Sequence, residues 1–330
     1  MKTIKLTRKE LQRLWSISHI FEDKFASKEY LKHFFSDIGI ATRYLEYMLW
    51  QLDTLYILSK HSSDLVWKGG TCIQSFLPYK FQRFSIDLDI NTQLDQASLK
   101  QLFEKEINRE IRGSKKEEII ENISFGTFHF HSEDKQIGSM NFTRIVPTKH
   151  GGEIIFRGKT KVIGAIQIRV QVNYKLAENL GFIAQEVIEK TPSLIPEKII
   201  NKKFTFPHES IADLLSDKIV TMAEIPGFHR GRYRIKDVYD IAALILTSKK
   251  EKDKGKILRK LDAYSDAWKT DVRTILKASM DGLANIKELN IEALGLRGSV
   301  GVLGFSEIIL KWNKITEEVY NFLEALYNAS

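Results

Sequence analysis

Two aspartates in the first third of the chain have the spacing of a metal-binding pair. Asp87 and Asp89 lie in the segment 84–90, in which apolar and polar residues alternate strictly. This alternation predicts a strand that carries both carboxylates on one face, roughly 6–7 Å apart. Two carboxylates at this distance can bind one hard divalent cation or a pair of them, and such a cation can hold a triphosphate. The spacing therefore predicts metal-dependent phosphate chemistry.

A glycine-rich turn upstream of this strand could hold the phosphates. The turn is the sequence Lys68-Gly69-Gly70-Thr71. Its two glycines permit positive φ, and the threonine hydroxyl can cap the amides that follow. We therefore expect the turn to open a helix, whose N-terminus attracts phosphate groups.

The composition is that of a globular protein with more than one lobe. The chain has 330 residues, of which 43% are hydrophobic and 28% are charged, so it can bury a substantial core. Its one cysteine, Cys72, excludes an internal disulfide framework and suits a reducing compartment. The first twenty residues lack a continuous apolar core, and no uncharged run approaches a membrane span. We therefore expect a cytoplasmic protein with no signal peptide and no membrane partner.

The charge favours a polyanionic partner. The formal net charge of +8 favours nucleic acid over membrane, while a basic protein without a nucleic-acid role is the alternative. Arginines between 230 and 234 and the basic run 248–260 could follow a phosphate backbone. Such runs are also typical of solvated loops.

The periodicity of the sequence predicts helices at both ends of the chain and strands between them. Apolar residues recur at helical spacing in 7–60 and 97–113, and the pattern is almost wholly helical from residue 209 onward. A connection with three prolines, 176–210, precedes these last helices. Strands are expected at 122–130, 140–146, 153–157 and 162–174.

The glycine turn and the aspartate pair together resemble the nucleotidyltransferase family of the AbiEii and MenT toxins. After Gly-Gly-Thr comes the pattern Arg-x-Ser-x-Asp-x-Asp, formed by Arg83, Ser85, Asp87 and Asp89. The resemblance covers about residues 30–250 and does not assign a role to the tail. It implies an α+β protein with a DNA polymerase beta-like core, flanking N-terminal helices and a C-terminal helical lobe.

This resemblance implies a domain division and a set of binding residues. It implies N-terminal helices plus a nucleotidyltransferase domain in 1–205, a helical domain in 206–330, and an active site in the cleft between the two lobes. Asp87 and Asp89 would bind Mg²⁺ or Mn²⁺ as catalytic residues. The nucleotide would be bound by Lys68, Gly69, Gly70, Thr71, Arg83, Ser85, Lys218 and Lys236.

A second block of sequence extends the resemblance into the helical lobe. The family has an acidic residue followed by lysine on one helix, and then an Arg-x-Lys-Asp-x-Tyr-Asp stretch. Here Asp217-Lys218 and the run from Arg234 to Asp240 match these patterns. By this likeness Lys218 would contact the nucleotide phosphates, and Lys236 with Asp237 or Asp240 would complete the catalytic pocket. The alternative is that these residues form ordinary charge pairs on a helix surface.

One position departs from the family pattern. Polymerase beta-like enzymes have a third carboxylate on a neighbouring strand, and the resemblance aligns it with Gln171. An amide provides a neutral oxygen ligand but cannot act as a general base. The second metal site and activity itself are therefore open questions, and an ordinary surface strand residue is the alternative interpretation of Gln171.

The expected reaction is metal-dependent transfer of a nucleoside monophosphate from an NTP to a hydroxyl acceptor. The resemblance implies a tRNA 3′ end as the acceptor, and a toxin–antitoxin system with a cognate antitoxin. A catalytically silent module that binds nucleotides or nucleic acid is one alternative, favoured by Gln171. A small-molecule nucleotidyltransferase is another, but it would need an acidic acceptor pocket, and the positive charge of the chain argues against this.

Overall fold

The computed structural model divides the chain into two compact units, each made of several segments. The first contains Met1–Trp67, Ile86–Lys175 and Val187–Pro207, and the second contains Lys68–Ser85, Leu176–Glu186 and His208–Ser330. The residues described below are 47, 51, 54–56, 58–59, 65–77, 81, 83, 85, 87–92, 94–101, 130–132, 135–148, 151–160, 164–173, 186–188, 206–231, 234–248, 253–288 and 305–330. The two continuous domains expected from the sequence, 1–205 and 206–330, remain a prediction.

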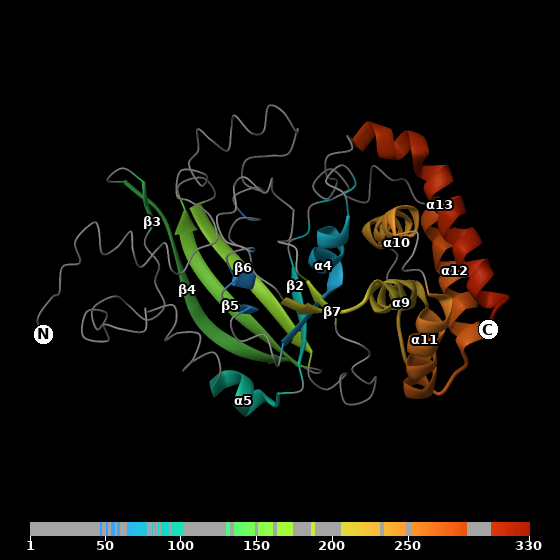
Figure 1. Cartoon of the computed structure of the whole chain (residues 1–330), viewed down its shortest axis with the longest axis horizontal. Coiled ribbons are helices and arrows are strands. Elements are labelled where there is room, and N and C mark those ends of the chain that lie inside the picture. Colours follow the sequence, from blue (N-terminus) through green and yellow to red (C-terminus); the bar gives the residue numbers. More distant parts are fainter. Residues whose placement is uncertain are drawn as a thin grey trace, which may run out of the picture. The chain divides into compact units, whose positions relative to one another are not determined.

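A mixed sheet lies mainly in the first unit (Figure 1). Within the described part of the chain the order of its eight strands is β3-β4-β5-β6-β2-β1-β8-β7. Strands β3 to β6 pair antiparallel with their neighbours, whereas β2 runs parallel to β6. The bounds are β1 Leu65–Lys68, β2 Leu88–Thr92, β3 Phe130–Ser132, β4 Lys135–Thr148, β5 Gly151–Thr160, β6 Gly164–Asn173, β7 Glu186–Ile188 and β8 Phe206–His208.

The β2 strand confirms the alternation read from the sequence. Leu88 and Ile90 are fully buried, whereas Asp87 and Asp89 are half-buried. The expected start at residue 84 was wrong, because β2 begins at Leu88, where its pairing with Val170 of β6 begins. Asp87 therefore lies directly before the strand.

Three long strands and a short helix of the first unit lie where the sequence predicted them. β4, β5 and β6 confirm the strands expected at 140–146, 153–157 and 162–174, with β4 and β5 longer than predicted. A short helix, α5 Gln96–Gln101, begins where the helix 97–113 was expected, and the rest of that prediction lies outside the described residues. The same holds for most of 7–60, in which the described residues are helical.

The second unit is helical, as the periodicity predicted. α9 lies at its centre and contacts α4, α10, α11 and α12, while α13 packs on α10 and α12 (Figure 1). Ser210 caps α9: its hydroxyl accepts from the Asp213 N–H, and the Asp213 carboxylate accepts from the Ser210 N–H. The bounds are α4 Gly69–Phe76, α9 Ile211–Met222, α10 Ile235–Thr247, α11 Lys254–Trp268, α12 Val272–Glu288 and α13 Phe305–Tyr327.

Among the helices described here, none is both long enough and apolar enough to cross a membrane. Cys72 is a free, buried thiol on α4.

Candidate functional site

Asp89 and Gln171, two of the predicted metal-binding residues, lie on one face of the sheet in the first unit. Asp89 of β2 is directly opposite Gln171 of β6, and Gln171 is in turn opposite Glu153 of β5. Side chains at paired positions of neighbouring strands point to the same face, so these three form a row across the sheet. Gln171 is exposed, and Asp89 and Glu153 are half-buried. The register thus places Gln171 beside Asp89.

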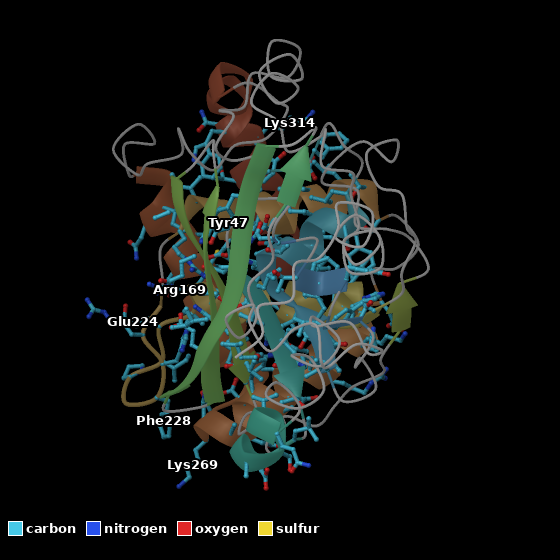
Figure 2. The ribbon with its side chains drawn as sticks, turned by 90° about the vertical axis from the view of Figure 1, so that its left-hand side faces the viewer. Tyr47, Arg169, Glu224, Phe228, Lys269 and Lys314 are labelled. Atoms are coloured by element: carbon cyan, nitrogen blue, oxygen red, sulfur yellow. The ribbon has the colours of Figure 1, made fainter. Side chains whose placement is uncertain are left out.

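Arg169 and Tyr47 add charge and a hydroxyl group to this region. Arg169 precedes Gln171 by two residues on β6, and its Nη1 lies 3.5 Å from Glu153 Oε1. The Tyr47 hydroxyl donates a hydrogen bond of 2.6 Å to the Gln167 carbonyl oxygen. Burial and the nearby Asp87 carboxylate raise the pKa of Tyr47 to about 12, while Arg169 acts in the opposite direction. Asp87, Arg169 and Tyr47 are therefore electrostatically coupled; Figure 2 labels the last two.

The donor set on this face fits a hard cation. Asp87, Asp89 and Gln171 offer only oxygen ligands, the type that Mg²⁺ and Mn²⁺ prefer. Among the described residues, no three or more His, Cys, Asp or Glu side chains are grouped so that they could hold a metal ion. A site with two carboxylates would rely on substrate phosphate and water for its remaining ligands, which is usual for Mg²⁺.

The predicted phosphate turn lies in the second unit and opens a helix, as expected. Strand β1 ends at Lys68 and α4 begins at Gly69, whose φ is +74°. The expectation that Thr71 caps the helix was wrong. The N-cap is Lys68, which makes no side-chain capping hydrogen bond, and Thr71 is buried inside the first turn.

Close packing explains the second glycine of the turn. A Cβ atom added at Gly70 would lie 2.8 Å from Arg83 Nη2 and 2.9 Å from Ser85 Oγ. Real Cβ atoms are essentially never found so close to other heavy atoms. The turn, Arg83 and Ser85 therefore pack closely against one another.

Arg83 is held by a buried carboxylate of α10. Its Nε donates to Asp240 Oδ1 at 2.7 Å and its Nη2 donates to Asp240 Oδ2 at 2.5 Å. The side-chain amide of Gln74 makes two further hydrogen bonds. Its Nε2 donates to Asp240 Oδ1, and its Oε1 accepts from the Arg83 backbone N–H. The Arg83 side chain is 3% exposed and that of Asp240 is 0% exposed. This two-bond ion pair holds Arg83 against the turn.

Lys218 of α9 joins the same cluster. Its Nζ donates to Asp237 Oδ1 at 2.5 Å and lies 3.1 Å from Asp240 Oδ2, and its side chain is 10% exposed. Arg234 Nε donates to the other oxygen of Asp237 at 2.6 Å. Burial opposes ionisation of Asp237, but Lys218 and Arg234 together hold its pKa below the usual range. Lys218 is therefore held in place by two aspartate side chains of α10.

Lys68 is turned toward a second network of charged groups. Its Nζ donates to Asp217 Oδ2 at 2.7 Å, and the Tyr264 hydroxyl donates to Asp217 Oδ1 at 2.6 Å. Burial raises the pKa of Asp217, but the opposing effect of Lys68 and Lys260 is larger. The pKa of Asp217 therefore lies well below its usual range. Because Asp217 and Lys218 are neighbours on α9, the Lys68–Asp217 ion pair ties the glycine turn to the helix that carries Lys218.

Glu209 belongs to this second network. Its Oε1 lies 3.8 Å from Lys68 Nζ and 3.9 Å from Lys260 Nζ. Burial and the neighbouring Asp217 carboxylate raise the pKa of Glu209 to about 7, against the opposing effect of the two lysines. Glu209 is therefore a buried carboxyl group that titrates near neutral pH.

The structure brings most of the predicted residues of each unit together. In the second unit Gly70, Ser85 and the ion pairs of Arg83 and Lys218 form one cluster. Lys236 is half-buried in the first turn of α10. Sequence reasoning missed Tyr47, Gln74, Glu153 and Glu209. Glu153 was found through the strand register of the structure, and no sequence signal identified any of the four.

The first unit thus carries an oxygen-rich strand face, and the second carries a lysine and an arginine held beside a glycine turn. Both sets of residues suit phosphate chemistry. A model of the family described as nucleotidyl transferase AbiEii toxin, type IV TA system, matches residues 51–296. The chain belongs to this family. The recognition made from Gly-Gly-Thr and Asp-x-Asp is thereby confirmed, as are the mixed α+β fold and nucleotidyltransferase activity.

The chain is similar to several solved structures at low sequence identity. MenT4, a nucleotidyltransferase toxin from Mycobacterium tuberculosis, superposes with a TM-score of 0.54 at 16% identity, and the match covers 97% of this chain and 90% of that one. A putative nucleotidyltransferase from Helicobacter pylori gives a TM-score of 0.40 at 15% identity, with 87% and 99% covered. A nucleotidyltransferase-like protein from Paracoccidioides brasiliensis gives 0.28 at 14%, with 70% and 88% covered. No curated protein sequence matched the chain.

Proposed function

We propose that this toxin-family enzyme transfers a nucleoside monophosphate from an NTP to the 3′ hydroxyl group of a tRNA. The observation that carries the proposal is the strand face of the first unit. There Asp89 lies opposite Gln171 and Asp87 directly precedes the strand, all three accessible to solvent. Such a face can bind a cation together with a substrate, which a buried and fully paired carboxylate cannot.

Asp87 and Asp89 would hold Mg²⁺ or Mn²⁺, with the Gln171 amide oxygen as a neutral third ligand. When bound, the metal supplies charge neutralisation on the triphosphate. Glu153 would act through Arg169, by holding its guanidinium on the same face. Arg169 is exposed enough to contact a phosphate group.

The nucleotide phosphates would be bound by the cluster of the second unit. Gly69, Gly70 and Thr71 begin α4, where backbone N–H groups and the helix dipole attract anions, and Ser85 lies against Gly70. Lys218 would offset the charge that develops on the leaving pyrophosphate.

The other predicted residues would position these groups. Arg83 donates to a buried carboxylate and Lys68 to a half-buried one, so we assign both residues to holding the turn. Asp237 and Asp240 would fix Lys218, and Lys236 would complete the pocket from the first turn of α10. In the reaction the acceptor oxygen forms a bond to the α-phosphorus, and the bond from this phosphorus to pyrophosphate breaks. The hydroxyl proton passes to water, because Gln171 cannot accept it.

Labelling of RNA tests this proposal directly. The protein is incubated with each α-labelled NTP, Mg²⁺ and total tRNA, and we expect labelled tRNA with one or more of the four nucleotides. Asp87→Ala should reduce labelling at least about a thousandfold, because the metal loses one of its two charged ligands. Asp281→Ala, an exposed aspartate of α12, is the control and should label normally. Equal labelling by wild type and Asp87→Ala would remove Asp87 from the mechanism.

A catalytically silent binding module is the second candidate, and Gln171 favours it. The exposed amide opposite Asp89 lacks the charge that a third carboxylate would bring. This candidate predicts NTP affinity without transfer of label to any RNA. The same experiment, combined with calorimetric titration of the unlabelled NTPs, separates the two functions.

The biological setting follows from the family. The type IV toxin–antitoxin description implies a cognate antitoxin, and we propose that this chain acts with one in the cytoplasm. A tRNA substrate and the lone, buried thiol of Cys72 are consistent with that compartment.

A further inference from the structure

The loop between α9 and α10 presents an aromatic ring to solvent. Phe228 is 52% exposed, more than any other large hydrophobic side chain in the described ranges. Its neighbour Gly227 has a φ of +82°, and a Cβ atom added there would meet no atom within 4 Å. Figure 2 shows the Phe228 side chain projecting away from the loop that carries it. The tip of the loop is therefore open to a ligand.

Several contacts make this loop rigid. Ile225 and His229 exchange two backbone hydrogen bonds of 2.8 and 2.9 Å, and the Phe228 N–H donates to the Ile225 carbonyl oxygen at 3.1 Å. At the base of the loop Gly231 packs so tightly that a Cβ atom would lie 2.8 Å from the Met222 carbonyl oxygen. The His229 ring stacks on Trp268 of α11, with centroids 4.8 Å apart and an interplanar angle of 10°. Phe228 is thus held in an exposed position at little entropic cost to binding.

The surroundings of Phe228 carry more positive than negative charge. Arg230 follows it by two residues and is exposed. Lys269, also exposed, comes directly after Trp268, on which His229 stacks. Glu224 is the one exposed carboxylate among the described residues of the loop. Together with the net charge of +8, this arrangement favours an anionic partner.

The loop is also close in the chain to the cation cluster. It leaves the end of α9, which carries Lys218, and leads to the start of α10, where Arg234 pairs with Asp237. A ligand that lies along the loop can therefore continue toward Lys218 within the second unit.

We propose that this loop binds an unpaired nucleotide near the 3′ end of the acceptor RNA, with its base stacked on Phe228 and its phosphate paired with Arg230. An exposed ring on a rigid support can stack on any base, and an adjacent arginine supplies the backbone contact. A single exposed ring with charged neighbours is much smaller than the apolar patch of a typical protein interface. The identity of the ligand as the acceptor rests on the proposed transferase function.

Binding of a short, 5′-labelled single-stranded RNA by the full-length protein tests the proposal. Phe228→Leu keeps an apolar side chain but removes the aromatic face, and should weaken binding about 5- to 100-fold. Phe228→Trp should retain wild-type affinity. Leu246→Ala changes another large exposed apolar residue, 48% exposed near the far end of α10, and should have no effect. Affinity for RNA falls as the salt concentration rises. Arg230→Ala should make this fall less steep, by about 0.7 in the slope of log affinity against log salt concentration.

Each outcome decides the proposal. Weaker binding by Phe228→Leu but not by Phe228→Trp or Leu246→Ala supports it, especially when a blunt duplex of the same sequence shows no such difference. Unchanged affinity of Phe228→Leu, or equal losses with leucine and tryptophan, would overturn it. The binding assay needs no catalysis, so failure of the transferase proposal would be seen separately, as equal labelling by wild type and Asp87→Ala.

Discussion

The carboxylates of the two units have opposite surroundings. Asp87 and Asp89 of the first unit are half-buried, and Asp89 lies on a strand face beside an exposed amide. Asp237 and Asp240 of the second unit have fully buried side chains, and both accept hydrogen bonds from cationic groups. The four residues looked alike in the sequence, where each was a candidate catalytic acid.

This difference separates binding from positioning. A carboxylate that binds a metal and a substrate must keep part of its coordination capacity accessible, which the strand face allows. The oxygens of the buried carboxylates already accept hydrogen bonds from Lys218, Arg83 and Arg234. These carboxylates therefore act on a substrate only through those basic side chains. Substitutions in the first unit should therefore affect catalysis, and those in the second unit should affect stability as well.

The largest expected effect on stability is that of Asp240→Ala. It leaves Arg83 buried without its two-bond partner and removes one neighbour of Lys218, which should cost about 3–5 kcal/mol of unfolding free energy. Asp89→Ala, by contrast, should cost less than about 1 kcal/mol while abolishing transfer. Urea denaturation gives the free energies, and hydrogen exchange should show lost protection in α9 and α10 for Asp240→Ala alone. Equal losses from both substitutions would contradict the distinction between the two sets of carboxylates.

Local sequence patterns predicted the features that depend only on residues close together in the chain. Alternation in 84–90 correctly placed Asp87 and Asp89 opposite the apolar face, and the two glycines correctly marked a turn before a helix. The capping role of Thr71 failed because sequence does not show where a helix begins to within two residues.

Long-range pairing was beyond sequence reasoning. Lys68 and Asp217 are 149 residues apart, and Arg83 and Asp240 are 157 apart, so no periodicity relates them. Nor could the sequence distinguish a lysine that faces substrate from one that faces a buried aspartate. The row formed by Glu153, Gln171 and Asp89 needed the register of three strands, which patterns do not fix.

Gln171→Glu tests whether the strand face of the first unit binds a metal ion. A carboxylate opposite Asp89 adds a negative charge to the predicted metal site, and should raise Mn²⁺ affinity at least about tenfold. Electron paramagnetic resonance of free and bound Mn²⁺ measures this without catalysis. Gln167→Glu, on the same strand but four residues earlier, should change the affinity much less. An unchanged Mn²⁺ titration for Gln171→Glu would show that its side chain is not part of the metal site.

The smallest expected effect is on the pH dependence of the unfolding free energy. It arises from the buried carboxyl group of Glu209 in the second unit. Because the pKa of Glu209 is raised from its usual 4.5 to about 7, the folded protein still holds a proton there that the unfolded chain has released. Protonation therefore favours the folded state, and this contribution is lost as pH rises from about 4.5 through 7. Asp217 acts in the opposite direction and at lower pH, since its pKa is depressed and its contribution is lost under acid conditions.

Glu209→Gln removes this titration, so its unfolding free energy should fall less steeply between pH 5 and 7. The change in slope cannot exceed that of one proton, about 1.4 kcal/mol per pH unit. Denaturant unfolding at several pH values measures it, with Glu317→Gln, an exposed residue of α13, as the control. Identical slopes for wild type and Glu209→Gln would mean that Lys68 and Lys260 keep Glu209 ionised throughout this range. The second unit would then differ from the first in the burial of its charges but not in how they respond to pH.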